Sequence, residues 1–266
     1  MIRIFPALAG FALLTVGVAD AGQAAPVAAK AQTKKAPAKK ASAKKAGAKK
    51  KPAAAAKAPP APPVVRSAQA EQVAQWVETS HDNRGLPYVI IDKKGAHAFL
   101  FDAKGKPLAD APVLIGIAPG DDATPGVGSK SLAEIGPAEK TTPAGRFIAK
   151  FGVAAGKTRV LWVDYATSVA LHMIPPGNPK EKRRERMLSP AIDDNRITFG
   201  CINVPKVFYN QGVSPLFKRK GGVVYILPDI KPIEEVFPRL RVQPFLNAAA
   251  ERVKDRATDM ATAAPE

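Results

Sequence analysis

The chain has 266 residues, 40 Lys and Arg against 23 Asp and Glu, a formal net charge of +17, and one cysteine. A single cysteine excludes an intrachain disulfide framework and a cysteine-rich zinc site. The three histidines show no H-E-x-x-H spacing, so we expect neither a metal nor another cofactor. No apolar run reaches 18 uninterrupted residues, which argues against a multi-span membrane protein.

Residues 1–21 have the parts of an export signal. Arg3 gives a short positive start, residues 4–19 are almost wholly apolar, and Ala19-Asp20-Ala21 offers a small-x-small site for cleavage after Ala21. The signal can be removed or kept as an anchor. In either case we expect the chain to work in the periplasm or cell envelope, where a free thiol is unusual.

Residues 22–65 form a low-complexity segment with 17 Ala, 11 Lys and 7 Pro among 44 residues, and with no aromatic or acidic residue. Its lysine pairs recur every five residues, a period that matches neither a helix face nor a strand face. Repelling charges and the lack of bulky apolar groups predict a disordered tether. Such a tether can bind anionic envelope polymers or a membrane surface, act as a spacer, or bind nucleic acid; export disfavours nucleic acid.

The remaining residues predict a mainly β fold, a mixed sandwich or barrel of short strands with a few short helices. A helix is expected over 67–80, with Val73, Trp76 and Val77 on one face. Turn formers then separate short strands, expected at 88–92, 97–101, 113–118, 147–151, 160–165, 169–174, 196–200 and 223–227. We divide this part into an N-terminal helix (66–84), a catalytic domain (85–230) and a C-terminal extension (231–266) with a helix near 245–258.

The chemistry concentrates around the one cysteine. Residues 196–200 are predicted to form a strand and residues 204–211 a short helix that Asn203 caps. Cys201 would then lie at a strand-to-helix corner, where the helix dipole lowers the pKa of the thiol. The N–H groups of Gly200 and Cys201 could face an oxyanion. His172, on a β-like stretch, is the candidate general base.

Two segments resemble the L,D-transpeptidases, the family with a YkuD-type catalytic domain. The family signature runs H-x(n)-[S/T]-H-G-C-h-[N/R], and the chain has His172 followed by Thr198-Phe199-Gly200-Cys201-Ile202-Asn203. Upstream, Thr142-Pro143-Ala144-Gly145-Arg146-Phe147 is similar to the T-P-x-G-x-F segment of these domains. The resemblance covers about residues 85–230.

The resemblance implies a cysteine enzyme of cell-wall biogenesis that acts on peptidoglycan stem peptides. Cys201 matches the nucleophile, His172 the general base, and the Gly200 and Cys201 amides the oxyanion hole. The carbonyl of Met173 matches the group that supports the base. Arg196, Thr198 and Asn203 are expected near the substrate, with Arg196 reaching a carboxylate.

The chain departs from the family pattern at three places. Met173 follows the base where a small residue is more common. Phe199 replaces the usual histidine two residues before the cysteine, and 25 residues separate His172 from Thr198, about ten more than is usual. The extra segment, residues 175–195, contains the basic run 180–186; it is either a lid over the site or a solvated helix. The alternatives to cross-linking are an L,D-carboxypeptidase or amidase that uses the same cysteine, and a non-catalytic peptidoglycan-binding envelope protein.

Overall fold

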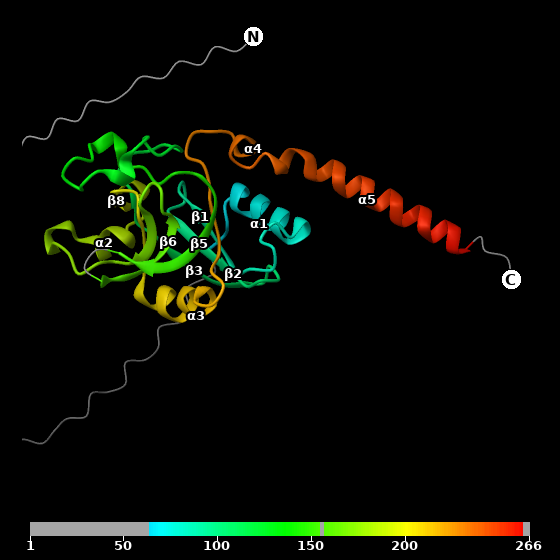
Figure 1. Cartoon of the computed structure of the whole chain (residues 1–266), viewed down its shortest axis with the longest axis horizontal. Coiled ribbons are helices and arrows are strands. Elements are labelled where there is room, and N and C mark those ends of the chain that lie inside the picture. The colour runs from blue at the N-terminus through cyan, green and yellow to red at the C-terminus, as the bar shows by residue number, and fades with distance from the viewer. Residues whose placement is uncertain (1–63, 155–156, 263–266) are drawn as a thin grey trace, which may run out of the picture. The chain divides into compact units, whose positions relative to one another are not determined.

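The computed structural model describes residues 64–154 and 157–262, so the predicted export signal and nearly all of the predicted tether lie outside the described residues. The described part is mainly β with a few helices (Figure 1). The strands are β1 (Tyr88–Asp92), β2 (His97–Phe101), β3 (Pro107–Pro112), β4 (Ile115–Gly116), β5 (Gly145–Val153), β6 (Arg159–Asp164), β7 (Val169–Met173), β8 (Arg196–Thr198), β9 (Ile202–Val204) and β10 (Gly222–Ile226). The α-helices are α1 (Ala68–Ser80), α2 (Arg183–Met187), α3 (Ser214–Phe217), α4 (Ile233–Val236) and α5 (Arg239–Thr262).

Eight strands form one sheet in the order β3-β2-β1-β10-β5-β6-β7-β9, and β4 pairs with β8 beside it. The β1–β10, β7–β9 and β4–β8 pairs are parallel, and the other pairs are antiparallel. Leu114, just after β3, exchanges two backbone hydrogen bonds with Asn203 of β9, at 3.0 and 2.9 Å. The two ends of the sheet therefore come back together, and the sheet is nearly closed.

Side chains alternate between two hydrophobic clusters, as the pleat of a strand requires. In β1, Val89 and Ile91 belong to the cluster on the concave side of the sheet. Tyr88 and Ile90 belong to the second cluster, together with the α1 residue Trp76. Because α1 covers this outer face, β1 is buried on both sides, and its sequence is apolar from Tyr88 to Ile91.

The helix predicted over 67–80 is confirmed as α1. Ser67 caps it, since its hydroxyl accepts the Ala70 N–H at 3.2 Å, which satisfies one of the free donors of the first turn. Its buried face includes Val73, Trp76 and Val77, the residues whose spacing predicts that face.

Two predicted elements have different bounds in the structure. Of the expected strand 113–118 only the two-residue β4 is a strand, because β3 already ends at Pro112. The expected helix 204–211 with Asn203 as its cap begins later, because Asn203 lies inside β9. Helical residues run from 206 to 217, with a π-helical stretch at Phe208–Val213. Pairing with β7 explains the difference, since it is a long-range contact that local propensity does not reveal.

A buried ionic network connects three segments that are distant in the sequence. The Lys93 ammonium donates to Asp121 at 2.9 Å and lies 3.4 Å from Asp229, and all three side chains are buried. Asp121 also accepts the backbone N–H groups of residues 229–231. Burial raises the pKa of Asp121, but these N–H donors and Lys93 outweigh it and lower the pKa to about 2.

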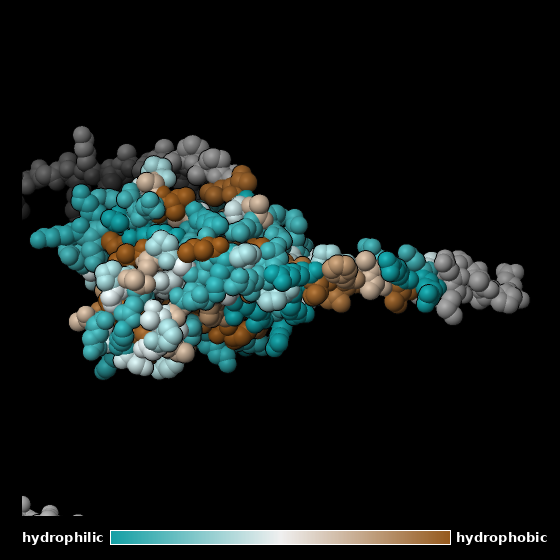
Figure 2. Space-filling model, turned by 90° about the horizontal axis from the view of Figure 1, so that it is seen from above, coloured by the Kyte–Doolittle hydropathy of each residue, from teal (hydrophilic) through white to brown (hydrophobic). Residues whose placement is uncertain are grey.

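The C-terminal helix α5 is longer than the predicted helix at 245–258. Its first residue, Arg239, pairs with the buried carboxylate of Asp82 at 2.9 Å. Further along, apolar side chains of α5 are exposed among polar ones (Figure 2), namely Val242, Phe245, Leu246 and Val253. Among the described residues, no helix has both the length and the apolar character needed to span a membrane.

Candidate active site

The parallel pairing of β7 with β9 brings the two residues predicted to be catalytic together. His172 of β7 is paired with Asn203 of β9, and Cys201 lies immediately before β9. The Cys201 sulfur lies 3.7 Å from the carbonyl oxygen of Ser168, the residue just before β7. The Ala170 N–H also hydrogen-bonds this sulfur. One strand repeat, about 6.6 Å, separates Ala170 from His172, so the residue that bonds the thiol and the residue that carries the imidazole lie two positions apart in β7.

The turn between β8 and β9 positions Cys201, and two threonine hydroxyls hold it. Thr198 Oγ1 donates to the Cys201 carbonyl at 2.6 Å and accepts the Gly200 N–H at 3.1 Å. Thr142 Oγ1 donates to the Gly200 carbonyl at 2.8 Å and accepts the Gly116 N–H at 2.8 Å. Gly200 has φ +123°, and a Cβ there would lie 2.7 Å from the Thr141 carbonyl oxygen. Only glycine fits this position.

Cys201 does not precede a helix, so the expectation that a helix dipole activates it is wrong. The side chain is a half-buried free thiol. Burial raises the pKa of the Cys201 thiol, and the Ala170 N–H and the charge of Arg183 oppose this only in part. The resting cysteine is therefore a neutral thiol, and a nearby base has to remove its proton before it can act as a nucleophile.

The hydrogen bonds of His172 fix which of its nitrogens is basic. Nδ1 lies 2.7 Å from the carbonyl oxygen of Met173, and a carbonyl can only accept, so Nδ1 carries the proton. Nε2 then holds the lone pair. Burial lowers the pKa of His172; the hydrogen bond to Met173 opposes this, and the charge of Arg183 adds to it. A neutral imidazole with an unprotonated Nε2 is the form that a general base needs.

Asn203 is buried beside His172, with Nδ2 3.3 Å from Nε2 of the imidazole. Its other amide atom, Oδ1, accepts a hydrogen bond from Arg183 at 2.7 Å. Arg183 also donates to Glu181 at 2.6 Å. A continuous hydrogen-bonded chain therefore runs from Arg183 through Asn203 and His172 to the carbonyl of Met173.

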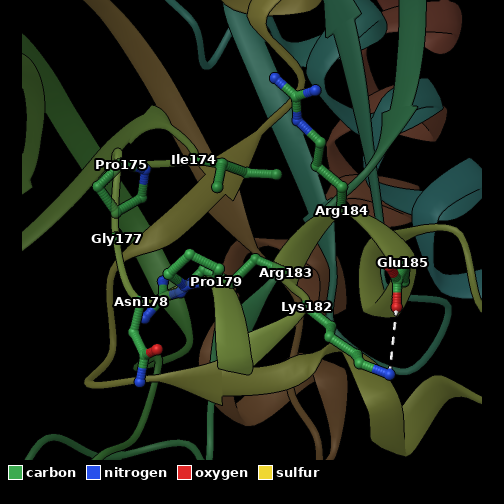
Figure 3. Close-up of a pocket in the computed structure, with 9 residues that line it drawn as sticks. All are labelled: Ile174, Pro175, Gly177, Asn178, Pro179, Lys182, Arg183, Arg184 and Glu185. Atoms are coloured by element: carbon green, nitrogen blue, oxygen red, sulfur yellow. Dashed lines mark ion pairs between the residues drawn. The ribbon is translucent and has the colours of Figure 1, made fainter.

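The basic insertion between β7 and β8 borders a pocket of about 240 Å³ beside this chain (Figure 3). The pocket lies between Ile174, just after β7, and the start of α2. Lys182 and Glu185 form a loose pair at 3.8 Å, and the Arg184 side chain extends away from them (Figure 3). Arg183 points into the protein instead, where its side chain is 15% exposed. The insertion therefore reaches the site through Arg183.

Three of the predicted substrate-binding residues have hydrogen-bond partners within the protein. Arg196 is bound to the buried Asp229 at 2.8 Å, so it is not a free cation for a substrate carboxylate. The hydroxyl of Thr198 donates to the Cys201 carbonyl and accepts the Gly200 N–H. Asn203 contacts His172 and Arg183. The Gly200 N–H already has Thr198 as its acceptor, which leaves the Cys201 N–H as the candidate oxyanion donor.

Phe199, which stands where a histidine is usual, makes a different contact. The ammonium of Lys140 lies 3.9 Å from the centre of the Phe199 ring, a cation–π arrangement. The proton-transfer groups described above do not include this position, so the substitution leaves them intact. Among the described residues, no group of three or more His, Cys, Asp or Glu side chains could hold a metal ion.

Comparison with known proteins gives structural neighbours alone. No family model matches the chain, and no curated protein matches it. Among solved structures, it is similar to a mutant of the Enterococcus faecium L,D-transpeptidase, with 16% identity over 53% of this chain and 49% of that one, and a TM-score of 0.30. An L,D-transpeptidase from Xylanimonas cellulosilytica gives 14% identity over 53% and 60%, with a TM-score of 0.30.

A third neighbour is the helical cell shape determining protein Pgp2 from Campylobacter jejuni, with 10% identity over 62% of this chain and 58% of that one, and a TM-score of 0.35. The chain thus spans between about half and three fifths of the length of these neighbours. At these scores the likeness carries no argument about chemistry, which rests on the geometry of the site.

Two residues of the site carry no sequence-based prediction. Thr142 belongs to the Thr-Pro-x-Gly-x-Phe segment, and its contact with the Gly200 carbonyl gives that segment a physical role. Arg183 is one of several basic residues in the insertion, and no local pattern separates it from Arg184. Its contact with Asn203 spans 20 residues, and only the fold creates it.

Proposed function

We propose that this chain is a cysteine-dependent L,D-transpeptidase that acts on peptidoglycan stem peptides in the cell envelope. The observation that carries the proposal is the placement of Cys201 beside His172, whose Nδ1 donates to the Met173 carbonyl and whose Nε2 is the basic nitrogen. The sequence signature around Cys201 and the predicted export signal support the same substrate and location.

In the first half-reaction, Nε2 of His172 takes the thiol proton. The sulfur of Cys201 attacks the carbonyl that joins the L-centre of diaminopimelate to a terminal D-alanine. The Cys201 N–H stabilises the oxyanion of the tetrahedral intermediate. The carbon–nitrogen bond then breaks, the imidazolium returns its proton to the leaving amine, and D-alanine departs. A thioester between Cys201 and the stem peptide remains.

In the second half-reaction, an amine of another stem peptide attacks the thioester. His172 accepts a proton from this amine and returns it to the departing sulfur, so that a new amide bond and the free thiol are formed. Both steps require a contact between Sγ and Nε2, whereas at rest the thiol faces Ser168 and Nε2 faces Asn203. Active-site hydrogen bonds of this kind are often completed only when substrate binds.

A second candidate function is binding to peptidoglycan without turnover. The observation that favours it is that the sulfur and Nε2 each have another hydrogen-bond partner at rest. Burial also raises the pKa of the thiol and lowers that of the imidazole. A binding protein would keep both groups in this state throughout.

Purified protein incubated with disaccharide tetrapeptides separates these functions. Transpeptidation releases D-alanine and yields a cross-linked dimer in the mass spectrum, whereas hydrolysis releases D-alanine and yields tripeptide alone. Cys201→Ala and His172→Gln should abolish either product. If the wild-type protein binds the peptides and releases no D-alanine, the catalytic proposal fails and the binding function stands.

We also infer that the lysine-rich segment 22–65 holds the protein near anionic envelope polymers. Its eleven lysines meet no acidic residue within the segment, and such a charge attracts polyanions in a salt-dependent way. Deletion of residues 22–65 should weaken sedimentation with cell-wall sacculi at low salt and leave D-alanine release unchanged. Equal sedimentation of both proteins at low salt would reduce the segment to a spacer.

A further inference from the structure

We propose that Arg183 is a positioning residue, which orients the Asn203 amide so that its N–H group holds His172 with Nε2 as the unprotonated nitrogen. The role rests on the proposed function only where it concerns catalysis. The orientation of the imidazole can be measured without turnover.

The first step of the argument concerns the direction of the Asn203 amide. The oxygen and nitrogen of an asparagine side chain have nearly the same shape, so their partners decide which way the amide points. A guanidinium has donors and no acceptor. Arg183 lies 2.7 Å from one amide atom of Asn203, which must therefore be the oxygen. The NH₂ group is then the one that faces His172.

The second step concerns the imidazole. Met173 presents a carbonyl oxygen to Nδ1, and Asn203 presents an N–H to Nε2. One acceptor and one donor together match the neutral ring protonated at Nδ1. If the amide were reversed, acceptors would flank both nitrogens, and that arrangement stabilises the protonated ring. The direction of the Asn203 amide thus decides whether His172 can act as a base.

The third step concerns charge. Arg183 approaches the imidazole from the insertion through Asn203, and Cys201 lies before β9 with its thiol turned to the Ser168 carbonyl. On the other side of β7, Leu161 and Trp162 of β6 form the pairs with Leu171 and Ala170, and neither is titratable. Within the described residues, Arg183 is the charge that acts on His172, and it adds to the lowering of its pKa by burial. The charge of Arg183 and the orientation of the Asn203 amide therefore both favour the neutral form of His172.

The contact between Arg183 and Asn203 is buried and held in place by a further ion pair. Asn203 is 1% exposed, and the Arg183 side chain, at 15% exposed, is held from its other side by Glu181. Arg184, the next residue, is exposed and extends away from the Lys182–Glu185 pair (Figure 3). The two arginines carry the same charge, so Arg184 provides a matched control.

The test compares Arg183→Met with Arg184→Met in the full chain. The midpoint and tautomer of His172 are followed by NMR of ¹⁵N-labelled histidine, and His172→Gln identifies its signal among the three histidines. Arg183→Met should raise the midpoint and reduce the fraction of Nδ1–H tautomer, whereas Arg184→Met should match the wild type. Arg183→Lys keeps the charge and one donor, so it should restore part of the wild-type midpoint.

Activity on stem peptides gives an independent readout. Arg183→Met should lower kcat/KM about tenfold or more, within the roughly 10²–10⁴-fold that a general base contributes, and should shift the acidic limb of the pH profile to higher pH. The positioning role is overturned if the Arg183 and Arg184 variants show the same His172 midpoint and tautomer. If the midpoint moves as expected but the wild-type protein releases no D-alanine, the positioning role stands and the proposed function fails.

Discussion

The hydroxyl of Thr198 lies 2.6 Å from the carbonyl oxygen of Cys201 and closes the turn that carries the thiol. The same oxygen accepts the Gly200 N–H, so one buried side chain satisfies two backbone groups. Burying such groups without partners costs free energy. The position of the sulfur is therefore set by a side chain three residues earlier.

Replacing Thr198 tests this relationship. Thr198→Val keeps the shape of the side chain and leaves a carbonyl and an N–H without partners, which should lower the free energy of unfolding by about 1–3 kcal/mol. Thr198→Ser keeps the hydroxyl and should lose less. Urea denaturation of both variants measures the difference. Equal stability of the valine and serine variants would show that the hydroxyl does not brace the turn.

Gly200→Ala should disrupt the same turn more severely. At φ +123° a Cβ is strained, which costs about 1–3 kcal/mol, and it would also displace the Thr141 carbonyl. Gly126→Ala is the control, because Gly126 has φ +77° with nothing within 4 Å of the added Cβ. Thermal unfolding should show a clearly larger loss for Gly200→Ala. Similar losses would mean that the close approach of Thr141 is unimportant.

Asp121→Asn should destabilise the fold by up to about 3–5 kcal/mol, because it removes the nearer of the two carboxylates that face the buried Lys93 charge and leaves only Asp229, at 3.4 Å. Asp122→Asn removes the same charge from the neighbouring residue, whose side chain is 74% exposed, and should change stability little. The pKa of Asp121 is lowered to about 2, so its contribution is complete above about pH 4 and is lost as the pH falls toward 2. Chemical denaturation at pH 7 and pH 3 measures the free energy of unfolding of both variants. Equal losses for Asp121→Asn and Asp122→Asn at pH 7 would contradict the prediction.

His172 should make the fold less stable in acid. Its pKa is lowered in the folded chain, so the unfolded chain binds a proton more readily as the pH falls below about 6.5. The free energy of unfolding should therefore drop between pH 7.5 and pH 5, and His172→Gln should make this drop smaller. His81→Gln, at an exposed position, should leave the drop as it is. A wild-type slope in the His172 variant would refute the assignment.

Hydrophobic patterns and turn residues in the sequence predict the strands whose ends are set by neighbouring residues. The largely apolar stretches at 88–92 and 97–101, each followed by turn residues, have the bounds of β1 and β2. Strand β9 escapes prediction because it has three residues, is followed by Pro205, and contains an asparagine that is also typical of a helix cap. Its pairing with β7 depends on residues about 30 positions away.

The candidate site also has residues that the sequence predicts and contacts that it does not predict. Cys201 and His172 are predicted from their residue types and local context, and Met173 from the family resemblance. The partners of Arg196, Thr198 and Asn203 are not predicted, since each hydrogen bond depends on the exact position of the backbone. A pattern of charges in the insertion cannot reveal that Arg183 points inward while Arg184 points outward.

The most direct test of the central claim is mass spectrometry of the intact protein after exposure to a carbapenem. A carbapenem presents a strained amide carbonyl, which an activated Cys201 should open to form a thioester. We predict that one carbapenem mass is added to the wild-type protein at Cys201, less to His172→Gln, and none to Cys201→Ala. A wild-type protein that stays unmodified, or a Cys201→Ala variant that is modified equally, would contradict a nucleophilic role for Cys201.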